Sequence, residues 1–360
     1  MKKQRILTLI GVLLILILFY LNWESIIEGL HDADYSLVLI AVLFWFLGGV
    51  LRAIRWRGLL NSGGEADIGL FFAIRALLGS FFIESIGPKI SSDLYRGTLL
   101  WTASGKRVGF SKSFGVIVFE RFLDFFLKLL IAFAGVILIG EAVSELGEGS
   151  AAAVIFSMLL LVGFALFLFL LSKEEVAIAI SEKWVKIAGP KEDSLAGKID
   201  PSELSKLANT FVSLAKSRRD LARSGTLTLG VFITDLLVWV FIFSSFEAFP
   251  FNKAQVDIFM LAFIMSVVTL AVFVSMFPGG YGVREIAASV ALVWAGVASE
   301  VAVTAVIALR LFNLLMNIVV GGSFFVITSM EVEGKKTKKS GMKPVISENP
   351  IFQDEKKPKS

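Results

Sequence analysis

Ionisable side chains that lie within long apolar segments are the residues of this sequence best suited to do chemistry. The segment 114–139 carries Glu120, Arg121, Asp124 and Lys128 among apolar neighbours. On a helix, Glu120, Asp124 and Lys128 share one face. Arg121 reaches Asp124 three residues later along the same helix. An ionised group at the centre of a membrane helix costs roughly 2.5–3.5 kcal/mol, so such groups face a bundle interior and mark functional sites.

The segment 301–328 carries a similar polar face. Arg310, Asn313 and Asn317 recur at spacings of three and four residues, which places them on one side of a helix. Asp235 lies in a further apolar segment. Two interpretations are open, because these groups either bind a charged ligand or form polar contacts that hold the helices together. The mixture of arginine and carboxylate favours a binding site, since a structural role needs fewer charges.

Proline and glycine interrupt two other apolar segments, 68–86 and 256–277. Each segment is typical of a descending helix, a break and a short returning helix. Backbone that is broken at membrane depth is tolerated only where it is buried in protein or lines a cavity. The residues that make the two breaks are Pro88, Pro278, Gly279, Gly280 and Gly282.

Each break is followed within eight residues by one acid and one arginine. Asp93 and Arg96 follow the first break, and Arg284 and Glu285 follow the second. The N-terminus of a helix attracts an anion, and an arginine in its first turn adds a full positive charge. These residues are therefore candidates for binding a phosphate. The alternative is a tight turn that needs its glycines for steric reasons only.

Arg52 and Arg55 stand with Trp56 and Arg57 after the apolar segment 36–51. Arginine and tryptophan commonly fix the end of a helix at the membrane interface. Arginine also binds lipid phosphates through two parallel hydrogen bonds. The sequence supports both interpretations equally.

The composition defines the environment that must hold these residues. Hydrophobic residues make up 56% of the 360 and charged residues 18%, against about 25% charged in soluble domains. The mean hydropathy of +0.79 predicts a protein with several membrane-spanning helices. There is no cysteine and the only histidine is His31, so we expect no disulfide, metal site or cofactor. Of the net charge of +4, +3 lies in residues 331–360, and no nucleic-acid surface is expected.

Charges between the apolar segments predict the topology. The positive-inside rule is satisfied throughout if 68–102 enters and leaves on the cytoplasmic face and 256–298 does so on the outer face. We therefore expect an all-α polytopic membrane protein of the cell membrane. It would have about six transmembrane helices, two oppositely oriented re-entrant hairpins and both termini in the cytoplasm. If the hairpins cross fully, up to eight segments span. The six predicted spans are 6–22, 36–51, 114–139, 151–171, 226–248 and 301–328.

The two hairpins belong to halves that resemble each other, 68–139 and 256–328. In each half a proline precedes an intramembrane arginine, by 33 residues in the first (Pro88 to Arg121) and by 32 in the second (Pro278 to Arg310). The halves are expected to have opposite topology. Inverted repeats with interrupted segments are typical of secondary transporters, in which the interruptions point to the binding site.

One integral membrane domain is predicted over residues 1–330. Its loop 172–225 is expected to form amphipathic helices on the cytoplasmic surface. The second of these starts at Asp200-Pro201, where aspartate caps the helix and proline takes its first position. The lysine-rich residues 331–360 are predicted to form a disordered cytoplasmic tail.

Four motifs, in this order, resemble the lysylphosphatidylglycerol synthase transmembrane-region family of flippase-like membrane proteins. The resemblance covers roughly residues 5–330, and Ser92 departs from the glycine that usually precedes the aspartate in that family. It implies translocation of lipids, best attested for aminoacylated phosphatidylglycerol and linked in other members to polyprenyl or glycan lipids. The motifs are Arg52-x-x-Arg55-Trp56, Pro88-x-x-x-Ser92-Asp93-x-x-Arg96, Glu120-Arg121-x-x-Asp124 and Pro278-Gly279-Gly280-x-Gly282-x-Arg284-Glu285.

We therefore expect a translocator of an anionic phospholipid or a polyprenyl- or glycan-linked lipid, and not an enzyme. The residues after the last span are low in complexity, so no aminoacyl transfer is expected. One alternative is a membrane-embedded lipid-modifying transferase with Asp93, Glu120 or Glu285 as base. Another is a non-catalytic partner of a glycosyltransferase or synthase, and a homo-oligomer is compatible with each. The substrate-binding residues are predicted to be Arg52, Arg55, Asp93, Arg96, Glu120, Arg121, Asp124, Arg284, Glu285, Arg310 and Asn313.

Overall fold

The computed structural model describes residues 27, 31, 33–62, 68–86, 89–104, 108–144, 201–246, 258–275 and 280–330. Every regular element in these ranges is helical, which confirms the predicted all-α class. Within the described ranges, three helices are long and apolar enough to cross a membrane: Tyr35–Asn61, Arg218–Ser245 and Ser299–Met330. The number of spans and the re-entrant course of the hairpins stay predictions.

Several predicted segments lie outside the described residues. They are the spans 6–22 and 151–171, most of the loop 172–225 and the tail 331–360. The described helices are α3 (Tyr35–Asn61), α4 (Leu70–Ile86), α5 (Lys89–Ala103), α6 (Phe110–Ser144), α9 (Pro201–Lys216), α10 (Arg218–Ser245), α11 (Ile258–Ser275), α12 (Val283–Trp294), α13 (Ser299–Met316) and the π-helix η3 (Asn317–Gly321), after which the chain stays helical to Met330.

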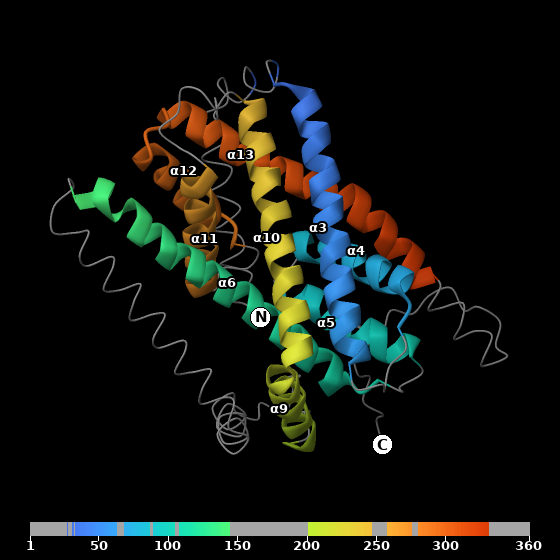
Figure 1. Ribbon diagram of the computed structural model, residues 1–360. Helices are drawn as coiled ribbons and strands as arrows, with labels where there is room; N and C mark the ends of the chain where they lie inside the picture. Colours follow the sequence, from blue (N-terminus) through green and yellow to red (C-terminus); the bar gives the residue numbers. More distant parts are fainter. Residues whose placement is uncertain are drawn as a thin grey trace, which may run out of the picture.

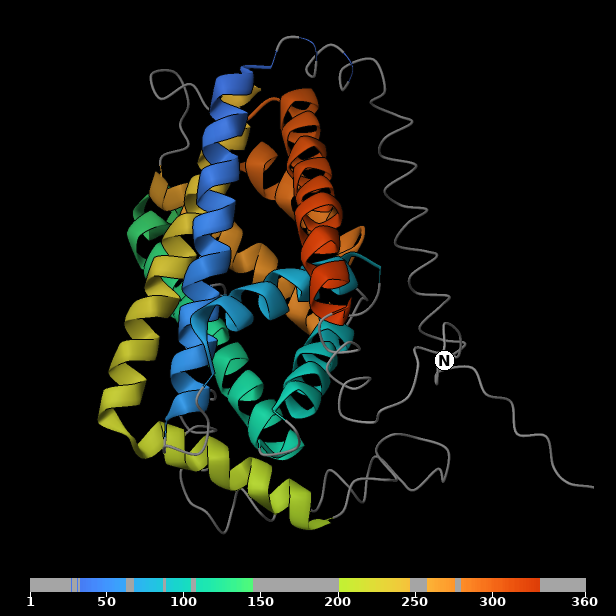
Figure 2. The same ribbon diagram turned by 90° about the vertical axis from the view of Figure 1, so that its right-hand side faces the viewer.

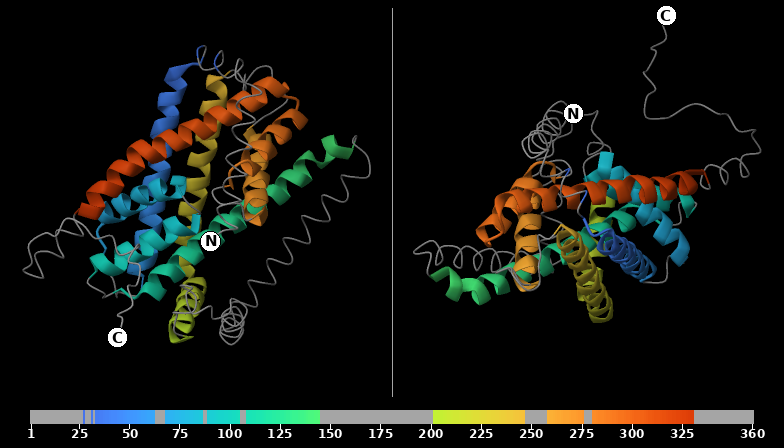
Figure 3. Two further views of the ribbon diagram at one scale, coloured as in Figure 1. Left: turned by 180° about the vertical axis from the view of Figure 1, so that it is seen from behind. Right: turned by 90° about the horizontal axis from the view of Figure 1, so that it is seen from above.

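Helices α3 and α10 form a long antiparallel pair (Figure 1). At one end the Asp34 amide donates to the Ser245 carbonyl at 3.0 Å, and Asp34 also caps α3 through the Ser36 amide. At the other end the Ser62 hydroxyl donates to Asp220 at 2.6 Å. Both helices are mostly apolar, and some of their large side chains, such as Leu43 and Ile233, stay exposed on the outer surface. Helices α6 and α13 run obliquely past the pair (Figure 3).

The two interrupted segments form two helix pairs, as the breaks predict. The first break separates α4 from α5, and the second separates α11 from α12. Gly280 and Gly282 take φ angles of +65° and +79°, a left-handed conformation that glycine adopts without steric cost. Residues 87–88 and 276–279, which include Pro88, Pro278 and Gly279, lie outside the described residues. Helices α4, α5 and α12 have 17, 15 and 12 residues, fewer than the about 20 that cross a bilayer.

Helix α9 lies across one end of the bundle beside the start of α6 (Figure 2). It begins at Pro201, as the sequence predicts. Its apolar face is not left free, because the Phe211 ring packs edge-on against Phe119 and Phe122 of α6, each at 5.4 Å between ring centroids. The amphipathic pattern of α9 therefore serves contact with α6, in addition to any contact with a membrane surface.

Helix α4 crosses η3 at a point where the backbones touch. A Cβ atom added at Gly321 would lie 3.0 Å from the Leu78 carbonyl oxygen and 3.0 Å from the Phe82 amide nitrogen. One added at Gly79 would lie 3.1 Å from the backbone of Phe325. Small residues allow helices in membranes to approach this closely. The crossing fixes α4, and with it one wall of the cavity described below, against the last helix.

We expect Gly321→Ala to lower the free energy of unfolding by about 1–3 kcal/mol, because its methyl group meets backbone atoms that cannot rotate away. Gly322→Ala is the matched control, since its added Cβ meets only the Phe82 ring, at 3.4 Å. Both changes gain the same helix propensity. Thermal unfolding of both variants in detergent is the measurement, and equal stability of the two would contradict the tight crossing.

Candidate functional site

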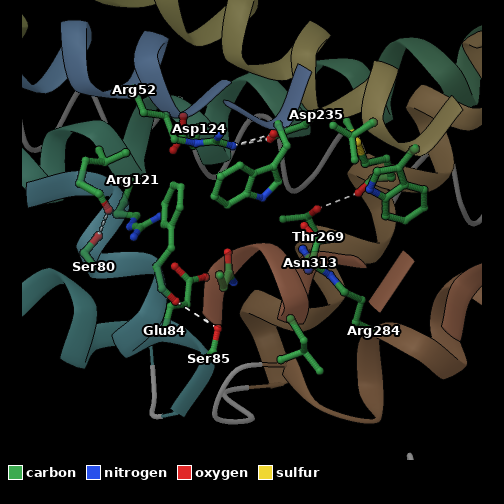
Figure 4. Close-up of a pocket in the computed structure, with 18 of the residues that line it drawn as sticks. Arg52, Ser80, Glu84, Ser85, Arg121, Asp124, Asp235, Thr269, Arg284 and Asn313 are labelled. Atoms are coloured by element: carbon green, nitrogen blue, oxygen red, sulfur yellow. Dashed lines mark hydrogen bonds and ion pairs between the residues drawn. The ribbon is translucent and has the colours of Figure 1, made fainter. Parts of the chain in front are cut away.

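A cavity of about 210 Å³ lies between the two helix pairs and the long helices (Figure 4). Its volume holds a phosphate-sized group with several waters, given that one water needs about 10–15 Å³ on this measure. Seven basic and four acidic side chains line it, among apolar helices. The basic residues are Arg52, Arg55, Arg96, Arg121, Lys128, Arg284 and Arg310, and the acidic residues are Glu84, Glu120, Asp124 and Asp235.

Arg55 is the centre of a buried ion network. Its side chain, 3% exposed, donates from Nη1 to Asp124 Oδ1 at 2.6 Å and from Nε to Glu120 Oε1 at 3.2 Å. A further bond from Nη1 reaches the Thr228 hydroxyl at 2.7 Å. These bonds join α3, α6 and α10. The position of Arg55 after an apolar segment is equally typical of an interfacial residue, but the structure places it among carboxylates.

The first helix pair adds one arginine and one acid to this network, Arg96 and Asp93 of α5, and the acid also binds Arg121 of α6. Asp93 Oδ1 accepts from Arg96 Nη2 at 2.8 Å and from Arg121 Nη2 at 2.7 Å. Glu120 Oε2 accepts from Arg96 Nη1 at 3.3 Å, so Glu120 joins Arg96 to Arg55. The sequence predicts that Arg121 reaches Asp124 along α6; the hydrogen bonds of the two instead go to Asp93 on α5 and to Arg55 on α3. Arg121 and Asp124 therefore each pair with a residue of another helix.

The second helix pair is arranged differently. Glu285 Oε2 accepts from the Gly282 amide at 2.8 Å, and its Oε1 lies 3.3 Å from Arg310 Nε. The Arg310 guanidinium stacks on the Tyr281 ring, 4.0 Å from its centroid. Arg284 makes no hydrogen bond or ion pair within the described residues, and the Nε atoms of Arg284 and Arg310 are buried without a hydrogen-bond partner. Figure 4 shows the Arg284 side chain beside Asn313 in the cavity.

The two halves share one pairing. An acid on the short helix after each break meets an arginine of the next long helix, Asp93 with Arg121 in the first half and Glu285 with Arg310 in the second. The two breaks also touch, because the Tyr281 hydroxyl donates to the carbonyl of Ser85 at 2.6 Å. These contacts put both breaks at one cavity, and the inverted orientation of the two halves stays a prediction.

Arg52 and Asp235 form a further ion pair at the cavity. Arg52 Nη2 lies 2.7 and 2.6 Å from the two carboxylate oxygens of Asp235. The predicted substrate-binding residues do not include Asp235 or Glu84, which line the cavity. The signal for Asp235 was a carboxylate in an otherwise apolar segment, but the position of its partner 183 residues earlier cannot be read from the chain.

The structure brings the predicted site residues together. Nine line the cavity: Arg52, Arg55, Arg96, Glu120, Arg121, Asp124, Arg284, Arg310 and Asn313. Asp93 and Glu285 are buried behind this lining and contact it through their arginines. Among the described residues no group of three histidine, cysteine, aspartate or glutamate side chains is placed to hold a metal ion. The arrangement as a whole presents guanidinium groups to a hollow inside an apolar protein, which suits an anion.

Known proteins with similar sequences include a family of membrane regions, a membrane protein and part of a glycosyltransferase. Residues 6–321 match the family described as "Lysylphosphatidylglycerol synthase TM region". A UPF0104 membrane protein of Pyrococcus horikoshii is 24% identical over 336 residues, which cover 89% of this chain and 96% of that protein. The glycosyltransferase AglD of Haloferax volcanii is 29% identical over 133 residues, 36% of this chain and 20% of that protein.

Proposed function

The chain belongs to the lysylphosphatidylglycerol synthase transmembrane-region family, and on that basis we propose that it moves a lipid with an anionic headgroup across the membrane. The observation that carries the proposal is the cavity, in which seven basic side chains surround a hollow between two interrupted helix pairs. A charged headgroup crosses a bilayer slowly because its hydration is lost in hydrocarbon. Side chains that replace this hydration lower the barrier.

The outer surface suits the lipid tail. Large apolar side chains are exposed on α3, α11, α12 and α13, and Phe259 and Leu43 are 75% and 70% exposed. In the proposed mechanism the headgroup enters the cavity while the acyl or prenyl tail stays in the bilayer outside. The protein lies in the cell membrane. The two helix pairs act as re-entrant hairpins, and both chain termini lie on the cytoplasmic side.

Reconstitution tests the function. Purified protein in liposomes that contain fluorescent phosphatidylglycerol is expected to make the inner-leaflet label accessible to a membrane-impermeant reductant. Protein-free liposomes and liposomes with heat-denatured protein are the controls. A rate of label loss equal to that of protein-free liposomes, with phosphatidylglycerol and with a labelled polyprenyl phosphate, would contradict the proposal.

A second candidate is a lipid-modifying transferase, which the partial match to the Haloferax volcanii glycosyltransferase favours. It requires a carboxylate that acts as a base. Glu120 and Asp93 each accept hydrogen bonds from arginines, so either carboxylate would have to leave an ion pair before it could act on a substrate. Product formation by the purified protein without lipid movement would favour this candidate. Stable co-purification with a glycosyltransferase would favour the third, a non-catalytic partner.

A further inference from the structure

The carboxylates that line the cavity are all engaged. Asp124 and Glu120 pair with Arg55, and Asp235 pairs with Arg52. Glu84 also has an interaction partner. A ligand with an ammonium group therefore finds no unpartnered carboxylate among these four. The Oε1 atom of Glu285, beside the cavity, has no hydrogen-bond partner within the described residues but lies 3.3 Å from Arg310 Nε. Binding such a group would require an existing ion pair to break.

The cations of the cavity are not all engaged. Arg96 and Arg121 donate to Asp93, as Arg55 does to Asp124. Arg310, in contrast, pairs with Glu285, and Arg284 makes no ion pair within the described residues. The Arg310 side chain is 11% exposed, and its Nε atom and that of Arg284 are buried without a hydrogen-bond partner.

These two arginines stand next to a small extension of the cavity. It has a volume of about 10 Å³, is lined by Trp239, Arg284, Glu285 and Arg310 among others, and is large enough for one water. Buried donors without a partner are uncommon because they lose their hydration on folding. A ligand oxygen at this place would restore the lost hydrogen bonds. Arginine binds phosphate through parallel N–H groups, and charge strengthens each bond.

We propose that Arg284 and Arg310 bind the phosphate group of a lipid whose headgroup carries no cationic group. This inference rests on the proposed function and narrows its substrate class. It selects an unmodified anionic phospholipid or a polyprenyl phosphate, whose shared chemistry is a phosphate ester with net negative charge. It disfavours an aminoacylated lipid, because the added ammonium groups would meet the excess of basic side chains in the cavity.

Lipid binding to the purified protein, measured by native mass spectrometry, tests the proposal. The probes are phosphatidylglycerol, a polyprenyl phosphate and lysylphosphatidylglycerol. We expect either anionic lipid to bind at least about 10-fold more tightly than the cationic one, the factor that one lost charge-assisted hydrogen bond produces. The tighter of the two anionic lipids identifies the source of the phosphate.

Substitutions locate the site. Arg284→Gln and Arg310→Gln are each expected to weaken binding of the tighter anionic lipid by roughly 10- to 100-fold. Arg284→Gln is the safer variant, because Arg284 makes no ion pair within the described residues that its loss would break. Arg75→Gln is the matched control, an arginine on α4 that stacks on Phe71 and does not line the cavity.

Two results would overturn the proposal: equal or tighter binding of lysylphosphatidylglycerol, or unchanged binding by both variants. Both are separable from failure of the proposed function, which is judged by lipid movement in liposomes. Selective binding without movement would support the phosphate site and contradict translocation. Movement of the anionic lipids, together with equal or tighter binding of lysylphosphatidylglycerol, would support translocation and contradict the phosphate site.

Discussion

Arg55→Gln is expected to lower the free energy of unfolding by about 3–5 kcal/mol, the usual result of removing one partner from a buried ion pair. Asp124 and Glu120 both accept hydrogen bonds from Arg55, and Glu120 is 3% exposed. Arg96 still neutralises Glu120 in the variant, but Asp124 loses the bonds from both of the Arg55 Nη atoms. Unfolding of the purified protein in mixed micelles measures the loss.

Arg57→Gln is the control for this prediction. Arg57 lies two residues later on α3 and donates from Nε to the Ile68 carbonyl oxygen at 2.6 Å. Its replacement should cost only about 0.5–1.5 kcal/mol, the net value of one hydrogen bond. The double change Arg55→Met with Asp124→Leu should regain much of the stability, because it removes both charges together. An equal loss for Arg55→Gln and Arg57→Gln would show that the network does not stabilise the fold.

Filling the cavity is expected to abolish lipid movement. The hollow of about 210 Å³ has room for little more than a headgroup and its waters. The chain has no cysteine, so a single introduced cysteine takes up a thiol reagent at one place only. Thr269 of α11 lines the cavity, and its hydroxyl donates to the Met265 carbonyl of its own helix at 2.8 Å. Thr269→Cys therefore directs a bulky group into the hollow without breaking a contact between helices.

The sequence contains enough to find most of the site. An ionised group in an apolar helix is costly unless it is paired or hydrated, and this cost alone indicates Glu120, Arg121, Asp124 and Arg310. The proline and glycine breaks indicate where the two helix pairs begin. Together these patterns predict that polar residues from both halves meet. Nine of the eleven predicted residues line the cavity, and the other two lie directly behind them.

The pairing within the site could not be predicted. Arg55 finds Glu120 65 residues later, and Arg52 finds Asp235 183 residues later. No local spacing encodes such contacts, because they depend on how α3 packs against α6 and α10. The same holds for the π-helix η3, which lies within a segment whose sequence predicts only a continuous helix. π-helical turns occur often at functional sites, and this one follows the cavity residues Arg310 and Asn313.

Arg52 and Arg55 show where composition misleads. Their arginine-rich segment with a tryptophan is typical of a membrane interface, yet Arg55 is buried and Arg52 faces the cavity. Arg57, at the end of the same segment, instead donates to the Ile68 carbonyl oxygen, which also accepts a hydrogen bond from the Asn61 side chain. Three neighbouring arginines thus have different environments, because successive helical positions point in different directions.

The central claim is that the charged hollow is the route of the headgroup, and single-cysteine blocking in liposomes tests it most directly. Thr269→Cys protein is treated with a bulky methanethiosulfonate, and the movement of labelled phosphatidylglycerol or polyprenyl phosphate is followed. Ser323→Cys is the control, since Ser323 makes the same bond to its own helix, is exposed and does not line the hollow. We predict that modified Thr269→Cys protein moves lipid no faster than protein-free liposomes, while modified Ser323→Cys protein stays active. Undiminished movement after modification at Thr269→Cys would contradict the claim.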